Sequence, residues 1–355
     1  MALAALQGSV DGVRGVKRAR FSCRVDPSPG PAGLQQKRRV KLAQQTEYLE
    51  ANPAGVAQAA DLLVQGATVA FATETVYGLG ADATNGSAVA AVYAAKGRPA
   101  FNPLIVHVAD LAMAEQIGVF DDTARALAAA FWPGPMSLVV PLRPEAGIAS
   151  LVTAGLETVA IRVPAHSGAR ALLAKFGGPV AAPSANPSGQ VSPTKAAHVL
   201  DGLGGKIAAV LEGGDCQVGL ESTILLVGEE VALLRAGGLA VEDVEGLIGK
   251  PVARPEDPET PQSPGQMAAH YATRAPLVMD WDGNAEGMVV IGFGPGEADF
   301  NLSESGDLQE AASNLFSMMR AADAVADGRQ IAVRPIPKTG LGLAINDRLK
   351  RATVP

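Results

Sequence analysis

Short apolar runs alternate with helical segments between residues 51 and 249, and this alternation limits the possible folds of the chain strongly. An apolar run between turn signals is typical of a buried strand, whereas apolar residues three and four apart indicate a helix. Strands are expected at residues 67–72, 104–108, 136–141, 157–163, 179–182, 207–211 and 222–227, and helices at 53–65, 86–96, 121–131, 167–176 and 194–201. We therefore predict one α/β domain over residues 46–249.

A proline-rich segment follows this domain. Five prolines between residues 251 and 264 exclude a helix or a central strand, so we predict a semi-rigid linker over residues 250–275. Beyond it, GMVVIGFG and QIAVRPIP are expected to be strands, and DLQEAASNLFSMMRAAD and LAINDRLKRA amphipathic helices. The pattern predicts a small βαβα domain over residues 276–355. Its GFGPGEA stretch lacks GxGxxG spacing and is expected to be a strand-to-loop turn.

The charge is distributed unevenly along the chain. Of 355 residues, 48% are hydrophobic and 18% charged, which is sufficient for a sizeable core. Residues 1–43 hold nine basic and two acidic side chains, so they carry +7 and leave −14 on the rest of a chain whose net charge is −7. We predict a disordered basic extension over residues 1–45, with a transit peptide as an alternative. The acidic remainder argues against a broad nucleic-acid-binding face.

Cysteine and histidine are sparse. Cys23 and Cys216 are the only cysteines, and the four histidines are scattered without metal-ligand spacing, so we expect neither a disulfide framework nor a protein-held metal. No apolar stretch of about 18 residues occurs. These features predict a cytosolic protein that does not insert into a membrane.

A polar cluster follows an apolar run in FATETVYGLGADAT, residues 71–84. The run from Val69 to Ala72 predicts a strand, and a loop that begins with Thr73, Glu74 and Thr75 is expected after it. Open α/β sheets bind ligands at the carboxyl ends of their strands. The alternative is a turn with ordinary capping residues.

Two cations follow the helix that is expected to end at Lys96. Lys96 and Arg98 are flanked by Gly97 and a proline, and no acidic residue occurs between Asp82 and Asp110. One cation is explained by a helix end, where it complements the helix dipole. Two cations in so rigid a segment indicate an anion receptor, for which phosphate is the expected ligand.

Arg162 and His107 are expected within apolar strands. The two-residue period places Arg162 on the same face as Thr158 and Ala160, where small neighbours leave space. Burying an arginine is costly unless a carboxylate or a phosphate pairs with it. A structural ion pair is the alternative for Arg162, and a core histidine is the alternative for His107.

Hydroxyl and amide side chains gather at two further strand ends. AAPSANPSGQVSPT places several serines and Asn186 after one strand, GLESTILLV places Glu221 and Ser222 at the start of another, and Arg235 adds a cation. No nucleophile with an adjacent base and no Walker motif is present. These residue types favour catalysis by positioning and electrostatic stabilisation, as in phosphoryl or nucleotidyl transfer.

Six motifs occur in a characteristic order: TETVYGLGADAT, KGRPAFNPLIVH, FWPGPMSLVV, VAIRVPAH, AAPSANPSG and GLESTILL. With them the chain resembles the YrdC/Sua5 family of L-threonylcarbamoyladenylate synthases, and HYATRAPL and PIPKTGLGLAINDRLKRA resemble the appended domain of the longer Sua5 form. The resemblance implies a twisted mixed sheet with helices, the YrdC-like catalytic domain, followed by a small Rossmann-like α/β domain.

The implied activity is that of a nucleotidyltransferase. It would make threonylcarbamoyl-AMP and pyrophosphate from L-threonine, bicarbonate or CO₂, and ATP, for t6A modification at position 37 of tRNA. Mg²⁺ is expected to be carried by ATP. The implied partners are a downstream tRNA threonylcarbamoyl transferase and, weakly, tRNA itself. The alternatives from other classes are an RNA-binding protein and a different ATP-using carbamoylating or acyl-adenylating enzyme.

The resemblance also assigns site residues. It implies L-threonine binding by Thr75, His107, Arg162, Ala182 and Ser222, ATP binding by Arg98, Asn102, Thr158, Ser184, Asn186, Ser192, Arg235, His270 and Tyr271, and catalytic roles for Lys96 and Arg98. Two positions depart from the usual family pattern. Ala72 stands where proline is usual, and Phe101 where an acidic residue is common.

Overall fold

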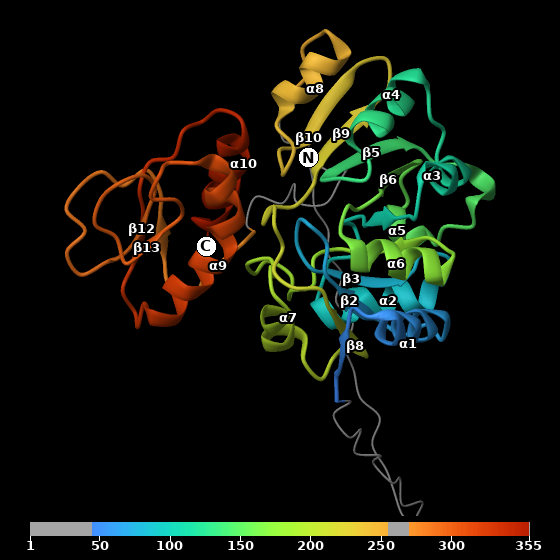
Figure 1. Ribbon diagram of the computed structural model, residues 1–355, viewed down its shortest axis with the longest axis horizontal. Coiled ribbons are helices and arrows are strands. Elements are labelled where there is room, and N and C mark those ends of the chain that lie inside the picture. Colours follow the sequence, from blue (N-terminus) through green and yellow to red (C-terminus); the bar gives the residue numbers. More distant parts are fainter. Residues whose placement is uncertain (1–44, 255–269, 355) are drawn as a thin grey trace, which may run out of the picture. The chain divides into compact units, whose positions relative to one another are not determined.

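The computed structural model describes residues 45–254 and 270–354, which belong to one compact unit with two β-sheets (Figure 1). The predicted basic extension over residues 1–45 lies outside the described residues except for its last one. Most of the predicted linker, residues 255–269, also lies outside them.

The larger sheet is mixed. Within the described residues it has ten strands in the order β1-β8-β2-β3-β7-β4-β6-β5-β9-β10. The strands are β1 (Glu47–Glu50), β2 (Val69–Phe71), β3 (Gly78–Asp82), β4 (Ile105–His107), β5 (Met136–Pro141), β6 (Thr158–Arg162), β7 (Val180–Ala181), β8 (Ala209–Glu212), β9 (Thr223–Val227) and β10 (Val231–Arg235). The sheet contains both parallel pairs, such as β4 with β6, and antiparallel pairs, such as β9 with β10, which confirms the expected mixed α/β fold.

Within the described residues, eight α-helices lie between or after these strands along the chain. They are α1 (Pro53–Val64), α2 (Gly86–Lys96), α3 (Leu111–Ile117), α4 (Asp122–Phe131), α5 (Ser150–Thr153), α6 (Ser167–Phe176), α7 (Ala196–Leu203) and α8 (Val241–Ile248), with a 3₁₀ turn at Pro144–Ala146. The local sequence explains both ends of α2. The Asn85 side chain accepts hydrogen bonds from the first turn, and Gly97 adopts a left-handed conformation with φ 63° at the end. This ending fixes the direction in which Lys96 and Arg98 leave the helix.

Residues 78–82 correct one expectation. They were expected to lie in the loop after the strand at 67–72, but they form β3, antiparallel to β2. Glycine permits this close pairing, because a Cβ atom on Gly80 would lie 2.8 Å from Cε1 of Phe71 and 2.9 Å from Cγ1 of Val180. The polar cluster therefore occupies a short connection between two adjacent strands.

The smaller sheet is parallel and has the order β11-β14-β12-β13. Its elements are β11 (Leu277–Val278), β12 (Val289–Gly292), β13 (Phe300–Asn301), β14 (Ile331–Val333), α9 (Leu308–Val325) and α10 (Leu341–Ala352). The four predicted elements of the βαβα pattern are confirmed as β12, α9, β14 and α10. Figure 1 shows both helices beside this sheet.

The two sheets do not have fully separate cores. Val76, Val191 and Leu220 from the first part of the chain belong to the same apolar cluster as Leu315 and Phe316 of α9. Hydroxyl groups also meet across this contact, since Thr194 Oγ1 lies 3.0 Å from Ser317 Oγ. The division into domains near residues 249 and 276 stays a prediction.

Candidate active site

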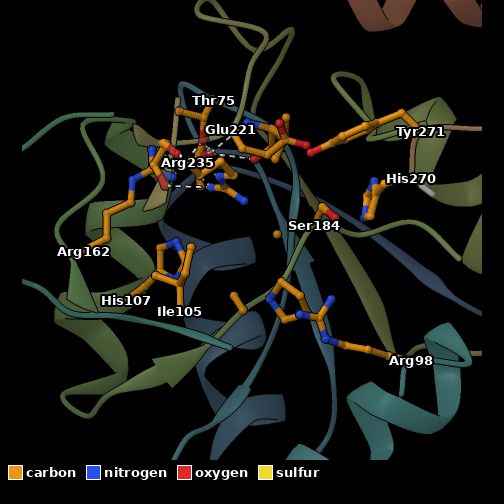
Figure 2. A pocket seen from close by; sticks show the side chains of 16 residues that line it. Thr75, Arg98, Ile105, His107, Arg162, Ser184, Glu221, Arg235, His270 and Tyr271 are labelled. Atoms are coloured by element: carbon orange, nitrogen blue, oxygen red, sulfur yellow. Dashed lines mark hydrogen bonds between the residues drawn. The ribbon is translucent and has the colours of Figure 1, made fainter. Parts of the chain in front are cut away.

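One pocket brings together most of the predicted site residues. It is lined by Thr73, Thr75, Val76, Gly78, Arg98, Ile105, His107, Arg162, Ala182, Pro183, Ser184, Glu221, Ser222, Arg235, His270 and Tyr271. His107 and Arg162 are register partners at the last residues of the parallel strands β4 and β6, the strand ends at which α/β sheets bind ligands. Figure 2 shows Arg162 and His107 on one side of the pocket and Arg98 and His270 on the other.

Arg162 is buried, with 3% of its surface exposed. It donates from Nη2 to Glu74 Oε1 at 2.7 Å, from Nη1 to Thr75 Oγ1 at 2.8 Å and from Nε to the carbonyl oxygen of Gly134 at 3.1 Å. A guanidinium has five N–H donors, so one N–H remains on each of Nη1 and Nη2. Arg162 is thus both a member of a structural ion pair and a fork with two donors left for a ligand.

The short connection after β2 is held by its own hydroxyl groups. Thr73 Oγ1 donates to the carbonyl oxygen of Val76 at 2.6 Å and lies 2.8 Å from Thr75 Oγ1. Glu74 is held by Arg162 and by a hydrogen bond from the backbone nitrogen of Ala165. Burial alone would raise the pKa of Glu74, but the charge of Arg162 and these hydrogen bonds outweigh it and lower this pKa. The polar cluster therefore orients Arg162 and presents Thr75 to the pocket.

His107 presents a neutral imidazole to the pocket. Burial, with the nearby charge of Arg162 as the second cause, lowers the pKa of His107 to about 3. Within the described residues its buried Nδ1 atom has no hydrogen-bond partner. The ring lies edge-to-face with Phe71 at 6.1 Å between centroids. A neutral ring beside Arg162 suits a polar ligand that needs one more hydrogen bond.

Arg98 is fixed by neutral oxygen atoms. Its Nε donates to the carbonyl oxygen of Asn102 at 3.1 Å, and its Nη2 donates to Asn102 Oδ1 at 2.6 Å and to Pro103 O at 2.8 Å. All three acceptors are uncharged, and in the described part of the chain Arg98 forms no ion pair with a carboxylate. Its positive charge is therefore available to an anion in the pocket.

Lys96 lies beneath a loop and does not line the pocket. Its ammonium donates to the carbonyl oxygen of Ser184 at 2.6 Å and also to that of Asn186. Backbone oxygens therefore pair with Lys96 in a segment where the sequence offers no acidic partner. Burial, followed by the charge of Arg98, lowers the pKa of Lys96 well below its usual value. The contacts of Lys96 hold the loop that carries Ser184.

The ends of β9 and β10 form another wall. Arg235 Nη2 donates to the carbonyl oxygen of Ser222 at 2.8 Å and to Ser222 Oγ at 3.2 Å. Ser192 Oγ donates to Glu221 Oε1 at 2.6 Å. Burial would raise the pKa of Glu221, but Arg348 and then Arg235 outweigh it and lower this pKa to about 2. Glu221 is thus a buried, ionised member of the pocket wall.

Four further predicted ATP residues do not line the pocket. Asn102 and Ser192 hold Arg98 and Glu221, and Asn186 donates within its own loop to Pro187 O and Gln190 O at 2.8 Å. Thr158 is the first residue of β6, paired with Pro141 at the end opposite Arg162. Thr158 and Arg162 are four positions apart in this strand, a distance of about 13 Å. The structure therefore does not bring Thr158 to the site.

His270 and Tyr271 reach the pocket from the segment that precedes β11. Tyr271 has a positive φ of 64°, and its ring stacks on Phe316 with 5.4 Å between centroids. The following residue, Ala272, donates from its backbone nitrogen to Gly189 O at 2.8 Å. These contacts fix the end of the segment against the Ser184 loop region and against α9.

Sequence reasoning missed two residues of the site. Glu221 lines the pocket, although only its neighbour Ser222 was assigned, and the buried Arg348 of α10 donates to Glu221 at 3.0 Å. The signal for Arg348 lay in LAINDRLKRA, where an arginine occupies the helix face that also carries the buried Ile345 and Ala352. An arginine on an apolar face indicates a buried partner.

No metal centre is formed by side chains within residues 45–254 and 270–354, which contain no group of three or more His, Cys, Asp or Glu side chains placed to hold a metal ion. Glu221, the carboxylate of the pocket, is already paired with Arg348. In the same ranges, no helix is both long and apolar enough to cross a lipid bilayer.

The pocket, with arginines on two sides at the strand ends of a mixed α/β sheet, is typical of proteins that bind anionic substrates. Residues 61–237 match the family Sua5_yciO_yrdC, described as telomere recombination, and residues 239–354 match the family described as threonylcarbamoyl-AMP synthase, C-terminal domain. The chain belongs to the YrdC/Sua5 family, in the form that carries the Sua5 C-terminal domain.

Similar proteins cover nearly the whole chain. It is 42% identical over 332 residues to the threonylcarbamoyl-AMP synthase of Bacillus subtilis (strain 168), a match that covers 86% of this chain and 95% of the relative. It is 38% identical over 318 residues to that of Pyrococcus abyssi (strain GE5 / Orsay), with 83% and 93% covered. The crystal structure of P. abyssi Sua5 complexed with L-threonine matches with a TM-score of 0.80 at 36% identity, covering 87% of this chain and 97% of the other.

Proposed function

We propose that this chain is an L-threonylcarbamoyladenylate synthase, which forms threonylcarbamoyl-AMP and pyrophosphate from L-threonine, bicarbonate or CO₂, and ATP. The observation that supports this most directly is the two-sided pocket. Arg162 keeps one donor on each terminal nitrogen beside a neutral histidine, and Arg98 lies on the opposite side of the pocket. Relatives named threonylcarbamoyl-AMP synthase, at 38–42% identity over most of their length, support the same activity.

The threonine carboxylate is assigned to Arg162. Two parallel N–H donors match the two oxygens of a carboxylate, and Glu74 and Thr75 hold the guanidinium in place without substrate. Thr75, His107 and Ser222 supply the neutral hydrogen-bonding groups around it, and Ala182 contributes backbone. Because His107 is neutral, one of its ring nitrogens can accept a hydrogen bond from the substrate.

The reaction then has two steps. The threonine amine attacks the carbon of CO₂, or of bicarbonate with loss of water, and gives up a proton to form a carbamate. A carbamate oxygen attacks the α-phosphorus of ATP, and the bond to the bridging oxygen breaks, so that pyrophosphate leaves with the electron pair. The arginines Arg98 and Arg235 stabilise the negative charge that develops on the phosphates.

Three further assignments complete the ATP side. Lys96 acts by holding the loop of Ser184, so that Ser184 and the nearby backbone face the nucleotide. His270 and Tyr271 close the same side of the pocket. Mg²⁺ is carried by the phosphate oxygens of ATP, because oxygen ligands from a nucleotide suit it without a protein cage. The tRNA-modifying transferase that receives the product, weak tRNA contact and a cytosolic location stay predictions.

The test is detection of the product by mass. The full chain is incubated with ATP, Mg²⁺, L-threonine and ¹³C-bicarbonate, and threonylcarbamoyl-AMP is expected to carry the label and to appear with one pyrophosphate per molecule. Parallel reactions without threonine, or with L-valine in its place, are expected to release little pyrophosphate. Equal pyrophosphate release without any amino acid, or a labelled adenylate of a different amine, would assign the chain to another ATP-using enzyme class.

A further inference from the structure

Arg348 lies in α10, remote in sequence from every motif of the site, yet it is fully buried beside the pocket. Its Nε donates to Glu221 Oε2 at 3.0 Å, and its Nη1 donates to the carbonyl oxygen of Ala236 at 2.6 Å. Asp347, the preceding residue of the helix, accepts a further bond from Nη1 at 3.0 Å. One side chain of α10 therefore contacts two separate segments of the catalytic part of the chain.

These two segments carry functional side chains. Glu221 directly precedes Ser222 at the start of β9, and Ala236 directly follows Arg235 at the end of β10. The segments approach each other closely, because Gly238 N donates to Glu221 O at 2.9 Å. Arg348 bridges them through a side-chain oxygen on one and a backbone oxygen on the other, and so limits the movement of Ser222 and Arg235 relative to each other.

A third contact links Arg348 to the segment that closes the pocket. The guanidinium carbon lies 5.6 Å from the centroid of the Tyr271 ring, and that ring also stacks on Phe316. A cation near an aromatic face is attracted by the ring quadrupole. Tyr271 is thus fixed by two side chains, from α9 and α10, that do not line the pocket themselves.

The bridge also depends on the opposite charges of Arg348 and Glu221. Glu221 is 6% exposed, and a buried carboxylate without a cation is strongly unfavourable. Arg348, which does not line the pocket, supplies this cation. Arg235 therefore does not have to serve as the main ion-pair partner of Glu221. A second hydrogen bond, from Ser192 Oγ to Glu221 Oε1, fixes the other carboxylate oxygen. Both oxygens of Glu221 are then oriented by groups outside the reacting centre.

We propose that Arg348 is a positioning residue of the adenylation reaction, which acts through Glu221, Ala236 and Tyr271 to hold Ser222 and Arg235 in their binding geometry. This inference rests on the proposed function. It gives the C-terminal part of the chain an indirect part in binding ATP and threonine: an arginine from that part supports the wall of the pocket without lining it.

The test compares Arg348→Lys, Arg348→Met and the control Lys350→Met in the full chain. Lys350 is exposed on the same helix, so the control removes one cation from α10 without touching Glu221. A lysine keeps the charge but cannot reach Glu221 and Ala236 with a rigid fork. We expect folded Arg348→Lys to raise the KM for ATP by about tenfold with a smaller change in kcat, and Arg348→Met to have a larger effect. The control should match the parent in both constants.

A double-mutant cycle with Glu221→Gln separates positioning from general loss of stability. If Arg348 acts through Glu221, the double variant should lose about as much kcat/KM as the more damaged single variant, because the two changes break one connection. Where Arg348→Met does not fold, the cycle with Arg348→Lys decides. Calorimetric titration with ATP gives a second measure that does not need turnover, and thermal unfolding shows which variants are folded at the assay temperature.

Parental KM values in folded Arg348→Lys, or fully additive losses in the cycle, would overturn the positioning role. Failure of the proposed function has a different signature, since the parent chain itself would then make no threonylcarbamoyl-AMP. The ratio of variant to parent ATP affinity still measures the effect of Arg348 in that case.

Discussion

Nη2 of Arg162 lies 2.7 Å from Oε1 of Glu74, and both side chains are buried at the edge of the pocket. The other oxygen, Oε2 of Glu74, accepts from the backbone nitrogen of Ala165 at 3.0 Å, so the carboxylate itself is fixed. The guanidinium is consequently oriented before a substrate arrives. Such preorganisation reduces the entropy that is lost when a ligand binds.

Replacing Arg162 with lysine should impair threonine use specifically. Three of the guanidinium donors serve Glu74, Thr75 and Gly134, and an ammonium cannot keep these contacts and also offer a fork to a carboxylate. We expect the KM for threonine to rise by about tenfold or more, while the Kd of ATP changes little. Arg170→Lys, on the exposed surface of α6, is the control. An unchanged threonine KM in folded Arg162→Lys would place the amino-acid pocket elsewhere.

Arg98→Ala should weaken ATP binding. The variant removes a charged group that lines the pocket and frees three oxygen acceptors of Asn102 and Pro103. A charge-assisted contact contributes about 1.5–3 kcal/mol, so calorimetry should give a roughly ten- to hundredfold higher Kd. Arg125→Ala is the matched control, because Arg125 forms a half-exposed surface pair with Glu115 at 2.7 Å. Equal Kd values for the two variants would remove Arg98 from the ATP site.

The buried His107 and the partly buried His198 and His270 should make the protein less stable as the pH falls from 7 to 5. Burial lowers the pKa of His107 and His270 to about 3 and that of His198 to about 4. The unfolded chain protonates these rings near pH 6.5 and the folded chain does not, so unfolding takes up protons. The free energy of unfolding should then fall by up to about 1.4 kcal/mol per pH unit for the buried ring of His107, and by less for the more exposed ring of His198, where solvent screens the charge. Buried carboxylates such as Glu221 take up protons, and so change the free energy of unfolding, only at lower pH.

Urea unfolding of His107→Asn checks this assignment. Removing the most buried of the three rings should reduce the slope of unfolding free energy against pH between 5 and 7 by about a third or more. The variant His166→Asn serves for comparison, since His166 is partly exposed. A slope in His107→Asn equal to that of the parent would mean that His107 is already protonated in the folded protein.

Gly237→Ala should damage both stability and activity. A Cβ atom there would lie 2.3 Å from Glu221 O and 2.4 Å from both Ser222 C and Thr223 N. All three are backbone atoms, so the segment that carries Ser222 must shift. Gly246→Ala in α8 is the opposite case, because nothing lies within 4 Å of its Cβ position. It should stabilise the chain by about 0.5–1 kcal/mol. Thermal unfolding and kcat/KM for the two variants give the comparison.

Most of the secondary structure can be predicted from the sequence, because apolar periodicity and capping residues act locally. The bounds of α2, α6 and β5 agree with the expected ranges. β3 was missed since GLGAD has two glycines and low strand propensity, and only close packing against Phe71 and Val180 makes a strand there favourable. The other missed elements are short or lie at sheet edges: β1, β10, β11, β13, α3, α5 and α8.

The site could be predicted only in part. Arg162 and His107 were found because strand period and polarity conflict within a few residues of sequence. The partner of Arg162 was not found, since Glu74 lies 88 residues away. The same reason hides the pair of Glu221 and Arg348, which are separated by 127 residues. Partners of buried charges depend on tertiary packing, and local patterns carry no information about it.

The shared apolar cluster of Val76, Val191 and Leu220 with α9 has a consequence for how the chain melts. Separating the two sheets would expose these side chains and leave Glu221 without its cation, so neither part should remain folded after the other has unfolded. Scanning calorimetry should accordingly record one endotherm in which the calorimetric and van't Hoff enthalpies agree. The two sheets are thus expected to unfold together, as a single cooperative unit.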